Sequence, residues 1–303
     1  MESNMTCNGF QYEVGKEYYK RMNTETINAI AYDAPILGYG TETVNTLRLW
    51  EAKSPQGFDL QLFNDQKYLE ASASAVKAED LSRVLYPNDT ERSGKELRLK
   101  QQYFFVSASL QDIVRKYKEK YGNVFSGFAD KIAIQLNDTH PVVAIPELMR
   151  IFLDSEKISW VEAWEICQKV FSYTNHTVLA EALEKWDINI FSSLLPRVYQ
   201  IIEEINRRFM TEISKKYPED WAKQQRMSII GNGEVRMAWL AIVGTHAING
   251  VAAIHTEILK HQTLKDWYEL YPEKFQNKTN GVTQRRWLLK ANPELAGYIT
   301  SLI

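Results

Sequence analysis

The sequence has little of what marks several classes of protein. Its 303 residues contain two cysteines, Cys7 and Cys167, too few for a disulfide framework or a cysteine-rich metal site. The formal net charge is −2, so no excess of charge points to nucleic acid or to an anionic membrane surface. The first residues are too polar for a signal peptide. A low cysteine count fits a reducing compartment, and we expect a cytoplasmic protein.

One apolar run, Met237 to Ile254, approaches a membrane span in character. Thr245, His246 and Asn249 interrupt it at spacings that would group them on one side of a helix. Polar residues inside a hydrophobic helix are costly in lipid but are tolerated in a protein core. We therefore predict a buried core helix with a polar notch, and no membrane span.

Strands and helices alternate through the middle of the chain. Residues 131–136 alternate as a short strand, residues 146–154 suggest a helix, and residues 160–174 read as a helix followed by a strand. This order is typical of a βαβ unit and predicts an α/β fold with a parallel sheet. Polar clusters follow both strands, at Asn137–His140 and at Asn175–Thr177, and we expect them to face one crevice at the carboxyl edge of the sheet.

Three longer helices are also predicted. Residues 58–86 form a polar, alanine-rich helical stretch without a broad apolar stripe, so this helix should project from the body or pair with a partner. A second helix over 94–121 should stop at Gly122. Pro196 suits the first turn of a third helix. That helix carries an apolar stripe at helical spacing, formed by Val198, Ile201, Ile202, Ile205, Phe209 and Ile213.

The local sequence leaves the role of the two polar clusters open. His176 fits a capped turn as well as a ligand contact when its own segment is considered alone. His140 and His176 are 36 residues apart in sequence, and neither belongs to a zinc-type helix motif, so we expect no metal site. A glycoside hydrolase would need a pair of carboxylates flanking the sugar. Asp138 is available for that role, but the sequence shows no second carboxylate in the same cluster.

Five blocks of the sequence together resemble the α-glucan phosphorylases, the family of glycogen, starch and maltodextrin phosphorylases. The resemblance implies a two-domain glycosyltransferase (GT-B) fold with the active site between two Rossmann-like α/β domains. This chain would hold an incomplete portion of it, with residues 1–280 as the C-terminal half of the N-terminal domain and residues 281–303 as a stub of the C-terminal, cofactor-bearing domain. The blocks are "YDAPILGYGTETVNTLRLWEAKSP", "SRVLYPNDTERSGKELRLKQQYF", "KIAIQLNDTHPVVAIPELMR", "SYTNHTVLAEALEKW" and "FQNKTNGVTQRRWLLKANPELA".

The resemblance also implies an activity. The family cleaves terminal α-1,4-linked glucose with orthophosphate and releases glucose 1-phosphate, using pyridoxal phosphate held as a Schiff base. The glycine-rich segment with the cofactor lysine and the basic residues that hold orthophosphate have no counterpart among these 303 residues. We therefore expect this chain alone to be inactive and not to bind pyridoxal phosphate. The alternative is a non-catalytic glucan-binding or partner-binding module. The family's dimer-forming helix matches Phe58–Asp80, so a homodimer is expected.

Site residues follow from the same resemblance. His176 matches the catalytic histidine that contacts the glucosyl unit, and Trp287 matches a tryptophan that packs near the cofactor. Each also has a plainer interpretation, since Trp287 suits a core and an asparagine before glycine, as at Asn280, suits a turn. The resemblance assigns further residues to substrate binding or to gating of the site: Asn88, Asp89, Arg98, Asp138, His140, Thr177 and Asn280.

One departure from the family pattern concerns regulation. Arg115 and Lys116 stand where the nucleotide-regulated members carry two arginines. Lysine does not reproduce the bidentate fork of a guanidinium group. We therefore do not extend nucleotide activation to this chain.

Overall fold

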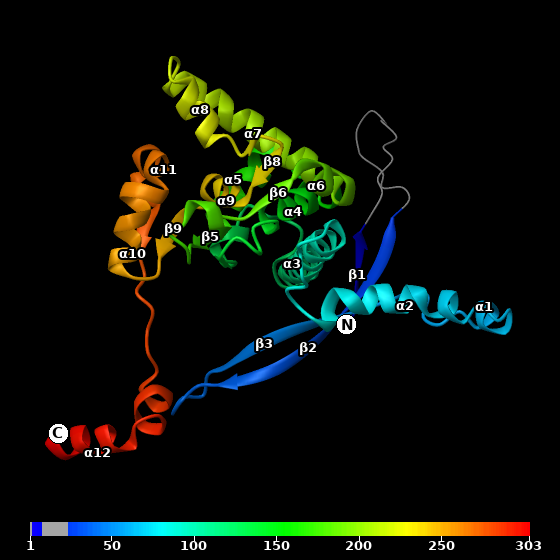
Figure 1. Ribbon diagram of the computed structural model, residues 1–303, viewed down its shortest axis with the longest axis horizontal. Coiled ribbons are helices and arrows are strands. Elements are labelled where there is room, and N and C mark those ends of the chain that lie inside the picture. Colours follow the sequence, from blue (N-terminus) through cyan, green and yellow to red (C-terminus); the bar gives the residue numbers. More distant parts are fainter. Residues whose placement is uncertain (1, 8–23) are drawn as a thin grey trace.

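The computed structural model describes residues 2–7 and 24–303. The sequence "QYEV" at residues 11–14 predicts a piece of strand, and this prediction lies outside the described residues. The first described element is an antiparallel sheet in which β2 pairs with both β1 and β3. The β2–β3 hairpin extends well beyond the body of the molecule (Figure 1). Its strands are β1 (Glu2–Cys7), β2 (Glu25–Leu37) and β3 (Val44–Lys53).

A four-stranded parallel sheet forms the centre, in the order β10-β9-β5-β4. The neighbouring strands are parallel at every pairing, so the predicted α/β class with a parallel sheet is confirmed. Buried side chains such as Leu136, Tyr173 and Ile248 fill one face of it, while the alternate residues, such as Gln135 and Thr174, are exposed or half-buried. The strands are β4 (Ile134–Asn137), β5 (Phe171–Thr174), β9 (Ala247–Gly250) and β10 (Phe275–Asn277).

Helices pack around this sheet and around one another. The helix α3 (Arg92–Tyr121) ends at Gly122, whose φ of 81° is the left-handed conformation expected at a helix end. It packs on α4 (Ala144–Arg150), which continues as η2 (Ile151–Ser155), and α4 in turn packs on α5 (Trp160–Val170) and α7 (Pro196–Lys216). All six residues of the predicted apolar stripe on α7 are buried.

The prediction of one buried helix over Met237–Ile254 was wrong. The helix α9 (Met237–Gly244) ends at Gly244, and Ala247–Gly250 form β9, a strand between β5 and β10. A Cβ atom at Gly244 would lie 2.8 Å from two carbons of Ile145, so α9 packs very closely on α4. Thr245, His246 and Asn249 therefore lie in a loop and a strand rather than on one side of a helix.

Smaller elements complete the body. A short antiparallel sheet has the order β6-β8-β7, and Figure 1 shows β6 and β8 beside α6. The remaining bounds of this region are η1 (Phe128–Asp130), η3 (Ala180–Ala182), β6 (Lys185–Asp187), α6 (Ile188–Leu194), α8 (Trp221–Met227), β7 (Ile230–Gly231), β8 (Glu234–Arg236), α10 (Ala253–Ile258), η4 (Leu259–Thr263), α11 (Lys265–Leu270) and η5 (Pro272–Lys274).

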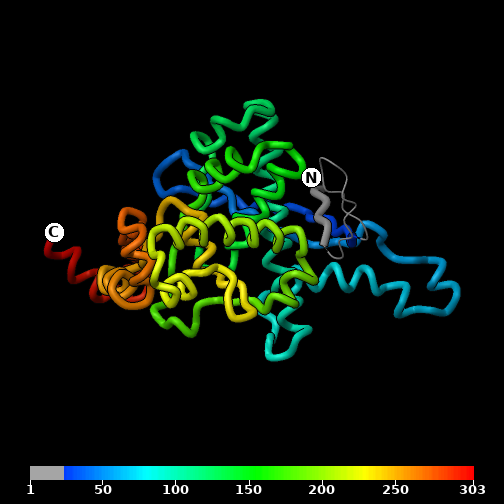
Figure 2. Tube along the Cα trace, turned by 90° about the horizontal axis from the view of Figure 1, so that it is seen from above, coloured from blue at the N-terminus to red at the C-terminus, as the bar shows by residue number. Residues whose placement is uncertain are grey.

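The predicted helical stretch 58–86 projects from the body as expected, at the end opposite to the C-terminal segment in Figure 2. It is two helices rather than one, α1 (Leu60–Asn64) and α2 (Tyr68–Arg83). Gln66 between them has a φ of 61°, a left-handed conformation that a continuous α-helix does not accept.

After β10 the chain runs without regular structure through residues 278–283 and then forms two last helices. These are η6 (Arg285–Lys290) and α12 (Pro293–Leu302). The sequence Asn292-Pro293-Glu294 predicts a helix start, and this is confirmed, because the Asn292 side chain accepts a hydrogen bond from the Leu295 N–H at 3.1 Å. Across residues 2–7 and 24–303, no helix combines the length and the apolar character that crossing a membrane requires.

Candidate functional site

The carboxyl edge of the parallel sheet is lined by asparagines. Asn137 and Asn277 are the last residues of β4 and β10, Asn175 follows β5, and Asn249 lies near the end of β9. The Thr174 hydroxyl donates to Asn249 Oδ1 at 2.8 Å, and the Asn175 N–H donates to the Asn249 carbonyl at 2.9 Å. This edge is therefore polar along its length, as a ligand-binding edge of a parallel sheet commonly is.

His176 stands exposed at this edge. Its Nε2 lies 2.5 Å from Asn137 Oδ1, so the two polar clusters meet as the sequence predicted. The fully buried Asn175 fixes the turn beneath it, because Asn175 Oδ1 accepts from the Thr177 N–H at 3.0 Å and Asn175 Nδ2 donates to the Tyr173 hydroxyl at 3.0 Å. The histidine is thus presented on a rigid loop.

Asp138 follows β4 in a strained conformation. Its φ of 67° lies in the left-handed region, which non-glycine residues adopt rarely and often at functional sites. The Asp138 carboxylate accepts from the N–H of Thr139 at 2.5 Å. This local bond holds the carboxylate against its own backbone.

A second polar group lies beside the first and is centred on Glu184. We call Arg98, Gln102, His140 and Glu184 the Glu184 cluster. Gln102 Nε2 donates to Glu184 Oε1 at 2.8 Å, while Arg98 Nη2 and His140 Nδ1 lie 3.4 and 3.9 Å from the same oxygen. Residues from α3, from the loop after β4 and from the segment before β6 therefore converge on one carboxylate.

Charges in the Glu184 cluster support each other. The Glu184 carboxylate raises the pKa of His140 above its ordinary value, although partial burial opposes this. Burial also tends to raise the pKa of Glu184, but its contacts with His140 and Gln102 outweigh burial, and its pKa is lowered. Glu184 is therefore an ionised carboxylate at neutral pH, with only 10% of its side chain exposed.

The Glu184 cluster also has unused hydrogen-bonding capacity. Four of its atoms are buried and have no hydrogen-bond partner among the described residues: Arg98 Nε, Gln102 Oε1, His140 Nδ1 and Glu184 Oε2. Arg98, Gln102 and His140 line a cavity of about 170 Å³ together with Tyr86 and apolar neighbours. Buried polar atoms are costly unless satisfied, so this arrangement suits a ligand or water that both donates and accepts.

The structure connects the loop that precedes α3 with this cluster. Arg98 Nη1 donates to Asp89 Oδ2 at 2.8 Å. Asn88 instead accepts from the Thr90 N–H at 3.0 Å and closes a local turn. Of the two loop residues assigned by resemblance, Asp89 is thus joined to the Glu184 cluster, and Asn88 shapes the loop.

Asn280 and Trp287 lie farther along the chain. The Asn280 N–H donates to the Val251 carbonyl at 3.0 Å, which attaches the segment after β10 to the segment after β9. No turn forms at Asn280 and Gly281, contrary to the Asn-Gly pattern. Trp287 is 63% exposed on η6, so the core interpretation of this residue was wrong for the chain as described.

Sequence reasoning missed Glu184 and Gln102. Glu184 lies in the same block as His176, but its partners Arg98 and His140 are 86 and 44 residues away, so no local signal joins them. The statement that no second carboxylate accompanies Asp138 was wrong, because Glu184 and Asp138 both act on His140 and on the buried Tyr173. A glycosidase acid nevertheless needs a raised pKa, and that of Glu184 is lowered.

The chain is similar in sequence to proteins of one known family. A family model described as carbohydrate phosphorylase matches residues 4–303. The chain belongs to the carbohydrate phosphorylase family. It is 53% identical over 294 residues to the brain form of glycogen phosphorylase from Homo sapiens, covering 94% of this chain and 35% of that protein. The liver form from Homo sapiens gives the same identity and coverage. The brain form from Bos taurus is 52% identical over 301 residues, covering 96% of this chain and 36% of that protein.

Membership gives the fold a context. Phosphorylases of this family have the two-domain GT-B fold, and this chain, with its mixed α/β structure and parallel sheet, covers only part of that fold. The chain spans about a third of the length of the curated relatives it matches. The resemblance to glycogen phosphorylases stated from the sequence is confirmed.

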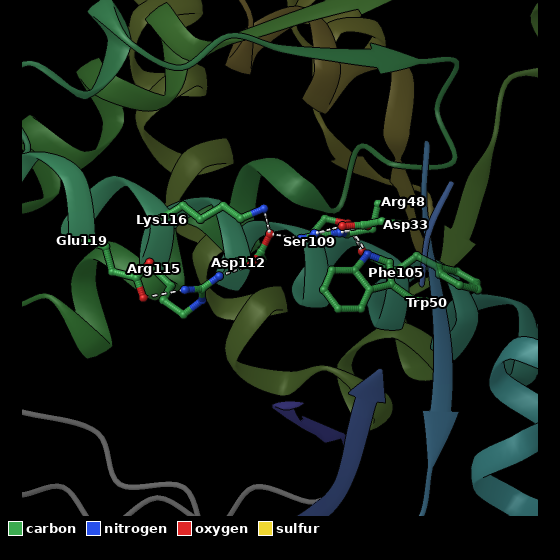
Figure 3. Close-up of polar contacts among 9 residues, drawn as sticks. All are labelled: Asp33, Arg48, Trp50, Phe105, Ser109, Asp112, Arg115, Lys116 and Glu119. Atoms are coloured by element: carbon green, nitrogen blue, oxygen red, sulfur yellow. Dashed lines mark hydrogen bonds and ion pairs between the residues drawn. The ribbon is translucent and has the colours of Figure 1, made fainter. Parts of the chain in front are cut away.

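The two cations at the position of the family's arginine pair are engaged within the chain. Asp112 accepts from Arg115 Nη2 at 2.7 Å and pairs with Lys116 Nζ at 2.8 Å, and Arg48 of β3 contacts the same carboxylate (Figure 3). Burial tends to raise the pKa of Asp112, but the bonds from Lys116 and Arg115 outweigh it and lower that pKa. These cations neutralise an internal carboxylate.

The described residues offer little that would hold pyridoxal phosphate or a metal ion. Trp287 is the one residue assigned to pyridoxal phosphate, and its exposure on η6 leaves it without a surrounding pocket. The half-buried Lys274 donates to the Ile242 carbonyl at 2.9 Å and lies over the Tyr271 ring, so it is directed into the protein. These residues do not fit pyridoxal phosphate. No group of three or more His, Cys, Asp or Glu side chains in the described ranges is arranged to hold a metal ion.

The Glu184 cluster predicts a pH dependence of stability. Because the folded state raises the pKa of His140, protonated His140 stabilises the fold fully below the ordinary histidine pKa of about 6.5, and this contribution is lost as pH rises through the raised pKa. The variant His140→Gln should not show this loss of stability as pH rises. We expect a difference below about 1 kcal/mol, since His140 is partly exposed and screened.

Urea unfolding at a series of pH values above and below neutrality measures this effect. The control is His246→Gln, which changes an exposed histidine and should keep the wild-type pH profile. A His140→Gln protein with the same pH profile as wild type would contradict the assignment.

Proposed function

We propose that this chain supplies the glucosyl-binding side of an α-glucan phosphorylase active site. The full-length enzyme would transfer a terminal α-1,4-linked glucose to orthophosphate and release glucose 1-phosphate. The observation that carries the proposal is the set of buried polar atoms without partners in the Glu184 cluster, in a chain that also presents His176 at the carboxyl edge of the sheet. Glucose hydroxyls both donate and accept, and are therefore of the chemistry that such atoms require.

Individual roles follow from position. His176 would contact the glucosyl unit, and its backbone carbonyl would face the positive charge that develops at the anomeric carbon, where a fixed dipole lowers the barrier. Thr177, Asp138, His140 and Arg98 would line the site. Asp89 would link the loop before α3 to Arg98 and so couple loop position to the site.

The remaining assigned residues lie at the edges of the site. Asn88 would shape the same loop through its local turn, and Asn280 would add a glucose contact from the segment after β10. Residues 1–280 would be the second half of the N-terminal domain, and residues 281–303 the start of the cofactor domain. The family favours a cytoplasmic location, which fractionation of expressing cells would check.

The chain alone is proposed to be inactive. In this family the proton for the departing glucan comes from the phosphate of pyridoxal phosphate, so the difficult chemistry belongs to the cofactor. Trp287 would pack near the cofactor only in a protein that also supplies the cofactor lysine and the orthophosphate-binding residues. The second candidate is a non-catalytic glucan-binding or partner-binding module, favoured by the same polar site.

Glucan binding tests the proposal directly. Titration of the chain with maltoheptaose, followed by NMR, should shift the amide signals of the loop 175–177 with a dissociation constant in the millimolar range or weaker, about 4 kcal/mol. His176→Ala should abolish these shifts. His261→Ala changes an exposed histidine outside the site and should leave them unchanged. Shifts that are identical in wild type and His176→Ala, or no shifts at all, would contradict the proposal.

We also propose a homodimer through Phe58–Asp80. This arm exposes large apolar side chains, among them Phe58, Leu60 and Leu69, the last 89% exposed. Exposed apolar surface on a projecting arm is typical of a protein contact. Light scattering should give twice the monomer mass for the chain and a lower mass for Leu69→Glu. A monomer at all accessible concentrations would disprove this arrangement.

A further inference from the structure

His255 stands behind the glucosyl-binding edge and is 9% exposed on α10. Its Nδ1 accepts a hydrogen bond from the Val251 N–H at 3.1 Å. An imidazole nitrogen that accepts carries no proton, so the neutral ring must carry its proton on Nε2. Burial and the neighbouring His176 lower the pKa of His255, while the Thr177 carbonyl opposes that change. The ring is therefore neutral at physiological pH.

The protonated Nε2 is buried and makes no hydrogen bond to any described residue. The Thr177 carbonyl opposes the lowering of the His255 pKa, so it is the acceptor that we assign to this N–H. In apo proteins such bonds are often long and tighten when a ligand is bound. One ring nitrogen, Nδ1, thus bonds to Val251, and the other, Nε2, is the one assigned to Thr177.

Val251 transmits this arrangement to Asn280. The Val251 carbonyl accepts from the Asn280 N–H at 3.0 Å, and the Gly250 carbonyl accepts from the Lys278 N–H at 3.1 Å. The segment 250–251 is therefore bonded on one side to His255 and on the other to the chain that follows β10. His255 is therefore linked through Val251 to the segment that carries Asn280.

The end of β9 packs closely against the start of α10. A Cβ atom at Gly250 would lie 2.8 Å from His255 Nδ1 and 2.4 Å from the Thr256 hydroxyl oxygen. Such approaches are shorter than real Cβ contacts, so only glycine permits the ring to reach the Val251 N–H. The strand end and the histidine are fitted to each other.

We propose that His255 is a positioning residue that holds the loop 175–177 and the segment 278–280 at a fixed distance, through Thr177 on one side and Val251 on the other. It would act on glucan through His176 and Asn280 without touching the sugar. The inference rests on the proposed function only for its effect on glucan binding. The tautomer and the coupling of the two segments are properties of the chain itself.

Three variants of His255 distinguish the contact with Val251 from the contact with Thr177. His255→Asn keeps an acceptor for the Val251 N–H but is too short to reach Thr177. His255→Gln extends a donor toward Thr177 but is poorly placed to accept from Val251. His255→Leu removes both functions and keeps an apolar side chain in the site. The control is His261→Leu, which changes an exposed histidine three residues beyond the end of α10.

Amide NMR spectra of the 303-residue chain provide the readout. The Leu variant should shift the amides of both 175–177 and 278–280. In the Asn variant the amide signals of 278–280 should return to their wild-type positions while those of 175–177 stay shifted. In the Gln variant the signals of 175–177 should return and those of 278–280 should stay shifted. Maltoheptaose affinity should fall about three- to ten-fold in the Leu variant, the loss of one net hydrogen bond. A simple packing role would not divide the shifts between two variants in this way.

Several results would overturn the proposal. Ring nitrogen chemical shifts of wild type that place the proton on Nδ1 would do so, and this measurement needs no variant to fold. Asn and Gln variants that match each other, or a Leu variant that moves neither segment, would do so too. If wild type binds no maltoheptaose, the proposed function fails, while the tautomer and the shift pattern still decide the role of His255.

Discussion

Purified chain supplied with pyridoxal phosphate, maltoheptaose and orthophosphate is expected to release no glucose 1-phosphate. Phosphorolysis requires orthophosphate to be positioned, the departing oxygen to be protonated and the positive charge at the anomeric carbon to be stabilised. In the proposed function, residues such as His176 would serve only the last of these. Loss of a general acid alone costs about a hundred- to ten-thousand-fold in rate, and loss of phosphate positioning removes a comparable or larger factor. A coupled assay for glucose 1-phosphate measures the result.

Pyridoxal phosphate is a reactive aldehyde, so lysine adducts must be separated from a true cofactor site. Burial lowers the pKa of Lys274 to about 8, which leaves part of its amine unprotonated near neutral pH and makes it a candidate for such an adduct. Borohydride reduction followed by mass spectrometry should give low, scattered labelling, and Lys274→Arg should remove any labelling at that residue. Turnover that rises with protein concentration and vanishes in His176→Ala would contradict the inactive assignment.

The sequence predicts best those elements whose burial has a regular period. The helix α7 has a polar face and an apolar stripe, and all six stripe residues are buried. The end of α3 could be predicted because Gly122 readily adopts the positive φ at which the helix ends. In both cases the determinant is local, a side-chain period or a single backbone conformation.

The segment 237–254 shows where this reasoning fails. Nearly every residue of α9 is buried, so its sequence carries no polar face that would mark the end of the helix. The strand β9 forms because β5 and β10 lie on both sides of it, and those partners are distant in sequence. Tertiary pairing therefore overrides the apolar pattern.

Some residues of the candidate site could be predicted from the sequence and others could not. The meeting of His176 with Asn137 was predicted from two strand ends of a parallel sheet, a rule that follows from topology. Glu184 and His255 were not predicted, because each acts through partners that only the folded chain brings near. The assignment of Asn280 and Trp287 came from family resemblance and stays a prediction.

The largest expected loss of stability comes from the buried ion pair of α4. Arg150 donates to the fully buried Glu147 through Nε at 2.6 Å and Nη2 at 2.7 Å, and Tyr103 and Ser107 of α3 donate to the same carboxylate at 3.0 and 2.7 Å. Burial tends to lower the pKa of Arg150, but Glu147 outweighs burial and raises it. The carboxylate therefore joins α4, which follows His140, to α3, which carries Arg98.

Glu147→Ala should lower the free energy of unfolding by about 3–5 kcal/mol, because it leaves the guanidinium group of Arg150 buried without its counter-charge. The double variant Glu147→Met with Arg150→Met removes both charges and should lose less than Glu147→Ala, since apolar replacement of a buried pair is often nearly neutral. Urea unfolding of both variants, of Arg150→Met and of Glu147→Met completes a double-mutant cycle.

The same cycle tests how the scaffold supports the site. A coupling within about 0.5 kcal/mol of zero would show that Glu147 and Arg150 act independently, contrary to their bidentate geometry. If the pair positions α3 against α4, variants that remain folded should also change the pH profile attributed to His140, because Arg98 reaches Glu184 from α3 and His140 reaches it from the loop that leads into α4. An unchanged profile in a destabilised but folded Glu147 variant would confine the role of the ion pair to stability.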